Sequence, residues 1–280
     1  MVEDLINRLI DLAIYEDIGD GDHSSLSCIP ADATGKVHLM VKQQGIIAGV
    51  EIAKIIFNRI DSSIVFEPLI EDGRLVNPGD YVFIATGTTH SLLQSERIVL
   101  NVMQRMSGIA TQTNRYVKMV EGTKAKILDT RKTTPGMRVF DKLAVRIGGG
   151  ENHRMGLFDM IMLKDNHIDF AGGIENAIRK ANEYLIKTDQ KLGIEVETRS
   201  IEEVESVLLV GNVQRIMLDN FNLTDTLKAV HLINGRFETE SSGGINLETI
   251  RGYAECGVDY ISVGAITHQI QSIDMNLKKV

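Results

Sequence analysis

The second half of the chain repeats one pattern, a short apolar run that ends at polar or glycine-rich residues. From about residue 110 onward these runs alternate with stretches of helical periodicity, which is typical of βα units on a parallel sheet. The runs lie at residues 125–128, 160–163, 192–196, 215–218, 237–240 and 258–263. About 160 residues are few for the eight βα units of a full barrel. The pattern therefore predicts an incomplete α/β barrel of six or seven strands.

The residues that follow these runs have the chemistry of a binding site. In α/β barrels the ligand lies at the carboxyl ends of the strands and on the loops after them. The residues at these positions are Asp129 to Lys132, Lys164, Glu197, Asp219, Ser241 to Gly244, and Gly264. The last two loops match the place where barrels commonly hold a phosphate, because backbone N–H groups next to glycine are accessible.

One segment of this half is basic although the protein is acidic. Lys126 to Lys164 holds eight Lys or Arg and four Asp or Glu, a net charge of +4, whereas the whole chain carries −8 and the remainder therefore −12. Focused positive charge attracts small anions. Arg131, Lys132, Arg154 and Lys164 together predict a ligand with three or four negative charges. The overall acidity argues against a nucleic-acid partner.

Four residues have candidate roles in more detail, and two of them, His153 and Lys164, have an alternative role. Glu197 and Asp219 are oxygen ligands suited to Mg²⁺, which prefers one or two carboxylates together with substrate phosphates. A ligand with a pyrophosphate fits both the cations and this metal site. His153 is either a structural hydrogen-bonding residue or a carboxylate ligand. Lys164 at a strand end has a rival role as a Schiff-base lysine, as in an aldolase.

The first third of the chain predicts a smaller α+β unit of short strands and helices. It begins with an amphipathic helix that carries Leu5, Ile6, Leu9 and Leu12, and it ends with a helix over residues 91–106 that Ser107-Gly108 terminates. No stretch approaches the roughly 20 apolar residues of a membrane span, and the N-terminus lacks the basic start of a signal peptide. Cys28 and Cys256 are expected to be reduced thiols. Together these features predict a cytoplasmic protein.

Long motifs across nearly the whole chain resemble those of the quinolinate phosphoribosyltransferase family. They are Glu16 to Asp22, Glu96-Arg97, Ser107 to Thr111, Asp129 to Gly136, Gly148 to Arg154, Lys164 to Ile168, Glu195 to Glu197, Leu218 to Phe221, Glu240 to Ile245 and Ser262 to Ala265. Their number and order make the resemblance specific. Its departures, Met137 and Leu143, touch no charged position.

The resemblance implies a fold and a reaction. It implies an N-terminal α/β hammerhead-like sandwich over residues 1–110, joined by the tail 268–280, and a partial α/β barrel over residues 111–267. It implies that quinolinate reacts with 5-phosphoribosyl 1-diphosphate to give nicotinate mononucleotide, CO₂ and pyrophosphate, a step of de novo NAD synthesis. It also implies a homodimer in which Arg97 completes the site of the neighbouring subunit, although Arg97 by itself reads as a solvated helix residue.

The resemblance also assigns roles to residues. Thr130, Arg131, Lys132, His153 and Arg154 are expected to hold quinolinate. Lys132, Lys164, Glu197 and Asp219 are expected to be catalytic; Lys164 contacts both substrates, and the two carboxylates face the ribose hydroxyls and Mg²⁺-pyrophosphate. The 5-phosphate is assigned to Ser241, Ser242, Gly243, Gly244, Val263, Gly264 and Ala265.

Four alternatives stay open at this point. The nearest is a related family member associated with molybdenum transport, which shares the barrel and much of the anion site. A nicotinate-using phosphoribosyltransferase would need fewer cations, because its substrate has one carboxylate. The other two are a Schiff-base aldolase and a non-catalytic phosphate-binding module. A phosphate-binding module has no need for Glu197 and Asp219 beside the cations.

Overall fold

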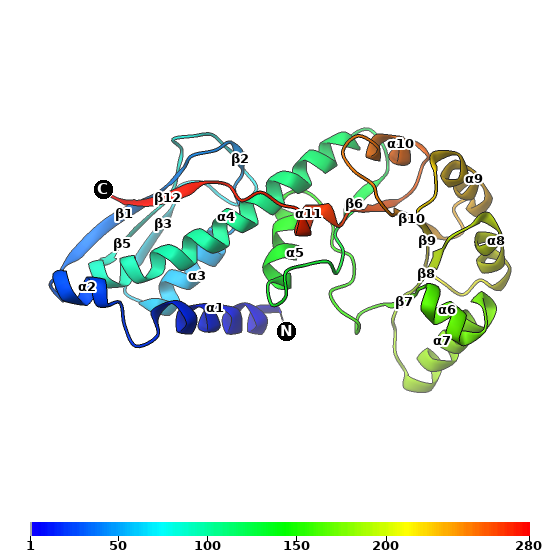
Figure 1. Cartoon of the computed structure of the whole chain (residues 1–280), viewed down its shortest axis with the longest axis horizontal. Coiled ribbons are helices and arrows are strands. Elements are labelled where there is room, and N and C mark those ends of the chain that lie inside the picture. Colours follow the sequence, from blue (N-terminus) through cyan, green and yellow to red (C-terminus); the bar gives the residue numbers. More distant parts are fainter. Residues whose placement is uncertain (1) are drawn as a thin grey trace. The chain divides into compact units, whose positions relative to one another are not determined.

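The computed structural model describes residues 2–280, and the chain divides into two compact units (Figure 1). Unit 1 contains the chain up to Asn114, Thr133–Gly149 and Ile266–Val280, and unit 2 contains Arg115–Lys132 and Gly150–Ala265. The segment Thr133–Gly149, which the sequence analysis placed in the barrel, thus clusters with unit 1.

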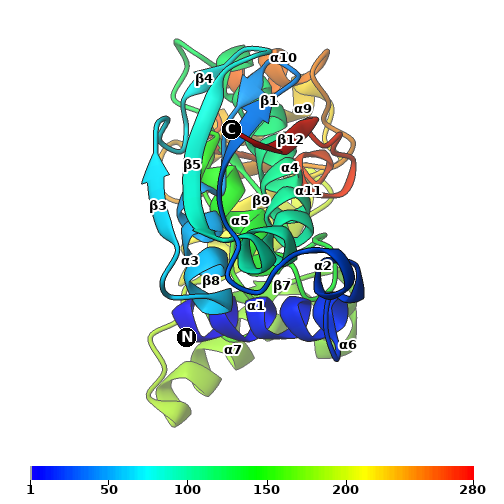
Figure 2. The ribbon, with the colours of Figure 1, turned by 90° about the vertical axis from the view of Figure 1, so that its left-hand side faces the viewer.

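Unit 1 is built on a four-stranded antiparallel sheet in the order β12-β1-β5-β3 (Figure 2). The strands are β1 (Thr34–Val41), β3 (Val65–Pro68), β5 (Tyr81–Thr88) and β12 (Met275–Lys279), and β2 (Gly45–Ile46) pairs separately with β4 (Leu75–Val76). The C-terminal strand β12 lies against β1 at the sheet edge, so the tail of the chain is part of this unit.

Five helices belong wholly or mostly to unit 1, and α3 packs on this sheet. They are α1 (Val2–Ile18), α2 (His23–Cys28), α3 (Val50–Ile60), α4 (Thr89–Met119) and α5 (Arg138–Ile147). Phe57 of α3 packs edge-on against Phe83 of β5, with ring centroids 5.7 Å apart, and Phe66 of β3 packs beside Phe83 at 4.7 Å. Such aromatic contacts favour tilted and edge-to-face geometry. They fix α3 on the sheet.

Two sequence predictions in unit 1 were wrong. The helix expected to end at Ser107-Gly108 continues to Met119 as α4. A Cβ on Gly108 would lie 2.4 Å from the carbonyl oxygen of Gln271, so glycine there permits a close backbone approach. The Ser107 hydroxyl accepts a hydrogen bond from the N–H of Ala48 at 2.9 Å. The apolar face of α1 is also less packed than expected, since Leu12 is 58% exposed.

Unit 2 holds a six-stranded parallel sheet in the order β6-β11-β10-β9-β8-β7, which confirms the predicted partial barrel. Its strands are β6 (Lys126–Leu128), β7 (Ile161–Leu163), β8 (Ile194–Thr198), β9 (Arg215–Asp219), β10 (Glu238–Ser242) and β11 (Tyr260–Ser262). Each overlaps one predicted apolar run. Among the described residues β6 and β7 are edge strands, so the sheet stays open.

Helices cover the outer face of this curved sheet (Figure 1). They are α6 (Asp165–Ala171), α7 (Ile174–Thr188), α8 (Ile201–Val210), α9 (Leu223–Ile233) and α10 (Ile250–Glu255), with the one-turn helix α11 (Ala265–His268) after β11. Buried residues such as Ile178, Val207 and Ile233 line their inner sides. The apolar contacts with these helices lie on the outer face of the sheet, and charged side chains of β8, β9 and β10 lie on its inner face.

Two further observations concern the chain as a whole. Across residues 2–280 no helix combines the length and apolar character that a bilayer crossing requires. Cys28 and Cys256 are both free thiols, as the sequence analysis expected.

Candidate active site

The carboxyl ends of the six strands of unit 2 lie along one edge of the sheet, because all its strands are parallel. Arg131 and Lys132 follow β6, Lys164 follows β7, and Glu197 and Asp219 lie at the ends of β8 and β9. The two glycine-containing loops follow β10 and β11, which are neighbours. The structure thus brings the predicted strand-end residues of unit 2 to one edge.

The loop after β6 carries two exposed cations. Arg131 and Lys132 are both exposed, and the N–H of Lys132 donates to the Thr130 hydroxyl at 3.0 Å. Further along this loop, the N–H of Thr134 donates to Asp141 at 3.3 Å. Asp141 is fully buried and forms a two-point ion pair with Arg105 at 2.8 and 2.9 Å. The loop is therefore anchored on both sides of its cations.

The segment that carries His153 and Arg154 is held by Asp129 at the end of β6. Asp129 is fully buried; its carboxylate accepts from the N–H of His153 at 2.8 Å and from the Asn152 side chain at 2.7 Å. The guanidinium of Arg154 donates to the carbonyl of Met160 at 3.1 Å. Burial and the nearby charge of Arg131 lower the pKa of Arg154. Two arginines close together in this way favour an anionic ligand.

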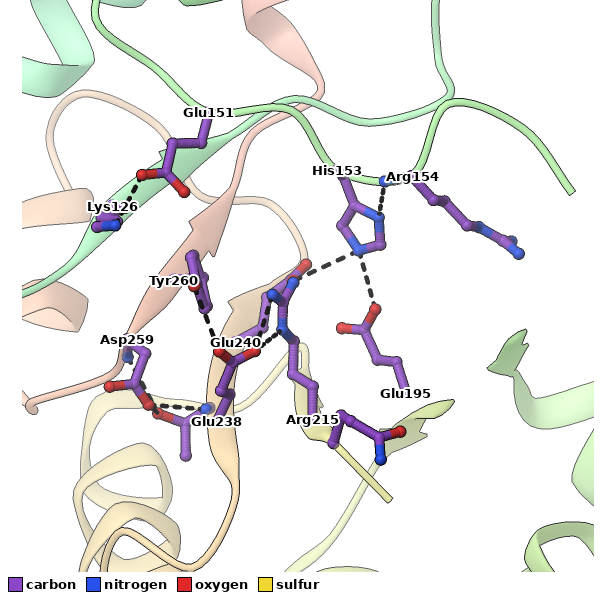
Figure 3. Close-up of polar contacts among 12 residues, drawn as sticks. Lys126, Glu151, His153, Arg154, Glu195, Arg215, Glu238, Glu240, Asp259 and Tyr260 are labelled. Carbon is purple, nitrogen blue, oxygen red and sulfur yellow. Dashed lines mark hydrogen bonds and ion pairs between the residues drawn. The ribbon is translucent and has the colours of Figure 1, made fainter. Parts of the chain in front are cut away.

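The imidazole ring of His153 makes contacts through both nitrogens (Figure 3). Its Nε2 atom lies 2.9 Å from Glu195 and 3.4 Å from Glu240. Its Nδ1 atom accepts a hydrogen bond from the N–H of Arg154 at 2.7 Å. The side chains of His153, Glu195 and Glu240 are all almost completely buried. Both ring nitrogens thus contact groups of the chain itself.

The charge on this ring is set by opposing effects. Burial favours the neutral ring, but the carboxylates of Glu195 and Glu240 outweigh it and raise the pKa of His153 to about 9. Burial and the charge of Glu240 raise the pKa of Glu195 to about 7, whereas His153 and Arg215 lower the pKa of Glu240 against its burial. However, a ring with a second proton on Nδ1 could not accept from Arg154. The observed geometry fits the tautomer with its proton on Nε2.

Three charged residues of this cluster, two of them fully buried, were not predicted as site residues. Glu195, Arg215 and Glu240 lie on the adjacent strands β8, β9 and β10, and Arg215 contacts Glu240 at 2.9 Å. The sequence signal was available, since these charges stand inside apolar runs. His153, Glu195 and Glu240 also have the composition of a metal site. Arg215 already supplies the positive charge that a metal ion would bring, so the structure favours an ion-pair cluster.

Lys164 and Glu197 meet directly. The Nζ atom of Lys164 lies 3.2 Å from a carboxylate oxygen of Glu197, and the Glu197 side chain is only 11% exposed. Lys164 is the N-cap residue of α6, and its N–H donates to the ring of His167 at 3.0 Å. The lysine backbone is thus fixed, while its amine is open to solvent.

Asp219 and the two glycine-containing loops complete the edge. Asp219 pairs in register with Ser242, and its carboxylate accepts from the Asn220 side chain at 2.7 Å. Gly243 has a φ of 95°, and a Cβ there would lie 2.3 Å from the Asn220 side-chain oxygen. The hydroxyl of Ser241 is buried and has no hydrogen-bond partner within residues 2–280. The N–H of Val263 donates to Leu128 at 2.9 Å, which ties the β11 loop to β6.

Arg97 stands apart from this set. It lies on α4 in unit 1 and is exposed. Its expected place in the site of a neighbouring subunit stays a prediction.

Known proteins resemble this chain along nearly its full length. Residues 22–107 match the family model of the quinolinate phosphoribosyl transferase N-terminal domain, and residues 109–278 match that of the C-terminal domain. The quinolinate phosphoribosyltransferase (decarboxylating) 1b of Nicotiana tabacum is 46% identical over 98% of this chain and 82% of its own. A probable nicotinate-nucleotide pyrophosphorylase (carboxylating) of Bacillus subtilis is 38% identical over 97% and 92%.

Solved structures agree with these matches. The crystal structure of NadC from Streptococcus pyogenes superposes with a TM-score of 0.92 at 38% identity, covering 98% of this chain and 97% of that one. The nicotinate-nucleotide pyrophosphorylase of Francisella tularensis gives the same TM-score and identity, with coverage of 99% and 96%.

Proposed function

This chain belongs to the quinolinate phosphoribosyltransferase family, and we propose that it transfers the phosphoribosyl group of 5-phosphoribosyl 1-diphosphate to quinolinate with loss of one carboxylate. The products are nicotinate mononucleotide, CO₂ and pyrophosphate, as in de novo NAD synthesis. The observation that carries this proposal is the convergence of cations and carboxylates at one edge of the unit 2 sheet. There Arg131, Lys132 and Lys164 follow two of the strands, and Glu197 and Asp219 end two others.

The proposed reaction replaces two groups. The pyridine nitrogen replaces pyrophosphate on C1′ of the ribose, and a proton replaces the carboxylate on C2 of the pyridine ring. The bond from C1′ of the ribose to the pyrophosphate oxygen breaks, and the pyridine nitrogen forms a new bond to C1′. The bond from C2 of the ring to its carboxylate then breaks. Its electron pair stays on C2, where the adjacent cationic nitrogen stabilises it, and a proton takes the place of CO₂. The chain must therefore bind several negative charges and hold the two reactants in line.

We assign quinolinate binding to Thr130, Arg131, Lys132, His153 and Arg154. Arg131 and Arg154 are close enough for the charge of one to lower the pKa of the other. Within the described residues the guanidinium of Arg154 pairs with no carboxylate and donates to a carbonyl. A dicarboxylate would neutralise this group of cations in two-point contacts. A direct bond from His153 would require one ring nitrogen to leave its observed partner.

We assign the ribose and its leaving group to Lys132, Lys164, Glu197 and Asp219. The carboxylates of Glu197 and Asp219 face the developing positive charge of the ribose. Their oxygens suit Mg²⁺, which takes most of its ligands from water and pyrophosphate. When bound, Mg²⁺ would neutralise charge on the departing pyrophosphate. The contact of Lys164 with Glu197 supports a role for this lysine toward both substrates.

We assign the 5-phosphate to the loops after β10 and β11, which contain Ser241, Ser242, Gly243, Gly244, Val263, Gly264 and Ala265. These loops follow neighbouring strands, so a single phosphate can reach both. The positive φ angles of Gly243 and Gly244, 95° and 61°, turn the backbone sharply after β10. Such turns expose N–H groups to an anion.

We further propose a homodimer and a cytoplasmic location. In the dimer, Arg97 would complete the site of the neighbouring subunit. The exposed apolar residues of α1, Leu12 and Tyr15, support an association surface. The two free cysteines fit a reducing compartment. Sedimentation equilibrium would test the first proposal and cell fractionation the second.

One experiment tests the proposed reaction. The purified chain is mixed with quinolinate, 5-phosphoribosyl 1-diphosphate and Mg²⁺, and nicotinate mononucleotide and CO₂ are measured. We expect both products in equal amounts. Nicotinate in place of quinolinate tests the nicotinate-using alternative, and borohydride trapping on Lys164 tests the aldolase alternative. Failure to consume quinolinate would overturn the proposal.

A further inference from the structure

Charged residues of the unit 2 sheet form two layers on its inner face. Residues two apart on a strand point to the same side and lie about 6–7 Å apart along it. Glu195 therefore lies one layer below Glu197 on β8, and Glu240 lies one layer below Ser242 on β10. The upper layer holds the residues assigned above to ribose and phosphate. The lower layer is buried and has no assigned role.

The lower layer is a connected ion-pair network (Figure 3). His153 contacts Glu195 and Glu240. Arg215 contacts Glu240 at 2.9 Å and the exposed residue Glu238 at 3.0 Å. Arg215 also lies 4.0 Å from the centre of the Tyr260 ring. Glu195 and Glu240 are completely buried. The interior of a barrel is normally filled by branched apolar residues, and buried charges are costly, so this layer calls for an explanation other than packing.

The network ends at the segment that carries Arg154. Glu195 and Glu240 fix one side of the His153 ring, and the other side accepts from the N–H of Arg154. Asp129 holds the N–H of His153 itself, so the backbone on both sides of this peptide is fixed. In Figure 3 the Arg154 side chain extends away from the cluster. A small rotation of the ring would therefore shift the arginine.

We propose that Glu195, Arg215 and Glu240 are positioning residues of the quinolinate site, which hold the His153 ring and through it set the position of Arg154. This inference rests on the proposed function, in which Arg154 binds a carboxylate of quinolinate. Arg215 acts one step further away, because it orients Glu240 and balances its charge. None of the three touches the substrate.

The central test compares two substitutions at one buried position. Glu195→Met removes the oxygen acceptor at similar volume, and Glu195→Gln keeps it. Because a misplaced Arg154 weakens quinolinate in the ground state and the transition state alike, Glu195→Met should raise KM for quinolinate about tenfold or more with little change in kcat. KM for 5-phosphoribosyl 1-diphosphate should stay within about twofold of the wild-type value, and Glu195→Gln should recover most of the loss.

Glu238→Gln is the matched control. Glu238 lies on the same strand as Glu240 and contacts the same arginine, but it is exposed and begins the strand at the opposite edge. It should leave both KM values unchanged. The proposal is overturned if Glu195→Met leaves KM for quinolinate unchanged, raises both KM values equally, or is matched by Glu238→Gln.

A second variant covers the case in which Glu195→Met does not fold. Arg215→Met combined with Glu240→Met removes opposite charges together, so neither is left alone in the interior. We expect KM for quinolinate to rise severalfold with KM for the other substrate unchanged, whereas a change in thermal stability alone would overturn the proposal. A wild-type chain that makes no nicotinate mononucleotide would instead contradict the proposed function, which separates the two failures.

Discussion

The amine of Lys164 lies 3.2 Å from the carboxylate of Glu197, across the carboxyl ends of the adjacent strands β7 and β8. This pair joins the cationic part of the candidate site to its acidic part. In the proposed reaction the amine has two anionic neighbours to stabilise, the quinolinate carboxylates and the departing pyrophosphate. Under the proposed function, this position would let one lysine serve both substrates.

Lys164→Met keeps the length of this side chain and removes its charge. We expect kcat/KM to fall about a hundredfold or more, because an ammonium next to developing negative charge is lost. Steady-state rates of nicotinate mononucleotide formation measure the effect. Lys180→Met is the control, since Lys180 is an exposed lysine on α7. Equal activity of the two variants would contradict the role assigned to Lys164.

Arg97 and Arg131 allow a test of the proposed shared site. Arg97→Ala and Arg131→Ala should each abolish turnover with unchanged circular dichroism, because both side chains are exposed. If Arg97 acts on the neighbouring subunit, mixed dimers of the two variants contain one intact site. Random exchange makes half of the dimers mixed, so the mixture should recover about a quarter of wild-type activity. No recovery after verified subunit exchange would show that Arg97 serves its own subunit or none.

Gly243 in the loop after β10 is predicted to require glycine. At its φ of 95°, Gly243→Ala places a Cβ 2.3 Å from the Asn220 side-chain oxygen and 2.8 Å from the Asn220 nitrogen. We expect a loss of at least about 1–2 kcal/mol in the free energy of unfolding, and a higher KM for 5-phosphoribosyl 1-diphosphate.

Gly235→Ala is the control that separates backbone strain from steric crowding in the effect of Gly243→Ala. Gly235 has a φ of 72°, and a Cβ added there would have no other atom within 4 Å. Gly235→Ala should lower the free energy of unfolding, because alanine is strained at this φ, without changing KM for 5-phosphoribosyl 1-diphosphate. Urea unfolding measures the first quantity and steady-state kinetics the second. A similar rise in KM for both variants would contradict a phosphate site at Gly243.

The strands of unit 2 could be predicted because buried parallel strands appear as short apolar runs. The place of Thr133–Gly149 could not be predicted, because it depends on contacts distant in sequence, such as the ion pair between Arg105 and Asp141. The local signals of Ser107-Gly108 favoured a helix end, and a tertiary contact with Gln271 overrode them.

The same distinction between local sequence signals and contacts distant in sequence applies to the residues of the candidate site. Arg131, Lys164 and Asp219 were predicted because each follows an apolar run, where barrels place their ligands. Glu195 and Glu240 lie inside such runs and were missed. Their role depends on His153 lying against both, which no local pattern displays.

Gly108→Ala tests the close approach inside α4. An exposed Gly-to-Ala change within a helix usually stabilises by about 0.5–1 kcal/mol. Here the new methyl would lie 2.4 Å from the Gln271 carbonyl oxygen. We therefore expect the opposite sign, a loss of about 1–3 kcal/mol. Gly252→Ala in α10 is the control, because its nearest neighbour is the flexible end of Leu223. A stabilised Gly108→Ala variant would contradict the contact.

The charge of the buried His153 ring predicts how stability depends on pH. Glu195 and Glu240 raise the pKa of His153 from 6.5 to about 9, against its burial. A folded-state pKa above the unfolded value stabilises the fold fully below pH 6.5, and that contribution is lost as pH rises through about 9. If the ring is charged in this way, wild-type stability falls by up to ~3 kcal/mol relative to His153→Gln over this range.

The hydrogen bond from the Arg154 N–H to Nδ1 makes the opposite prediction, because it needs a ring that carries its proton on Nε2 alone. Urea unfolding of wild type and His153→Gln at pH 6, 7, 8 and 9 distinguishes the two, since titrating groups that do not contact His153 cancel in the difference. Nitrogen-15 chemical shifts of the ring report the tautomer directly. A pH-independent difference in stability, with an Nε2–H shift pattern, would show that His153 is neutral and that hydrogen bonding to the carboxylates, rather than charge, holds the ring.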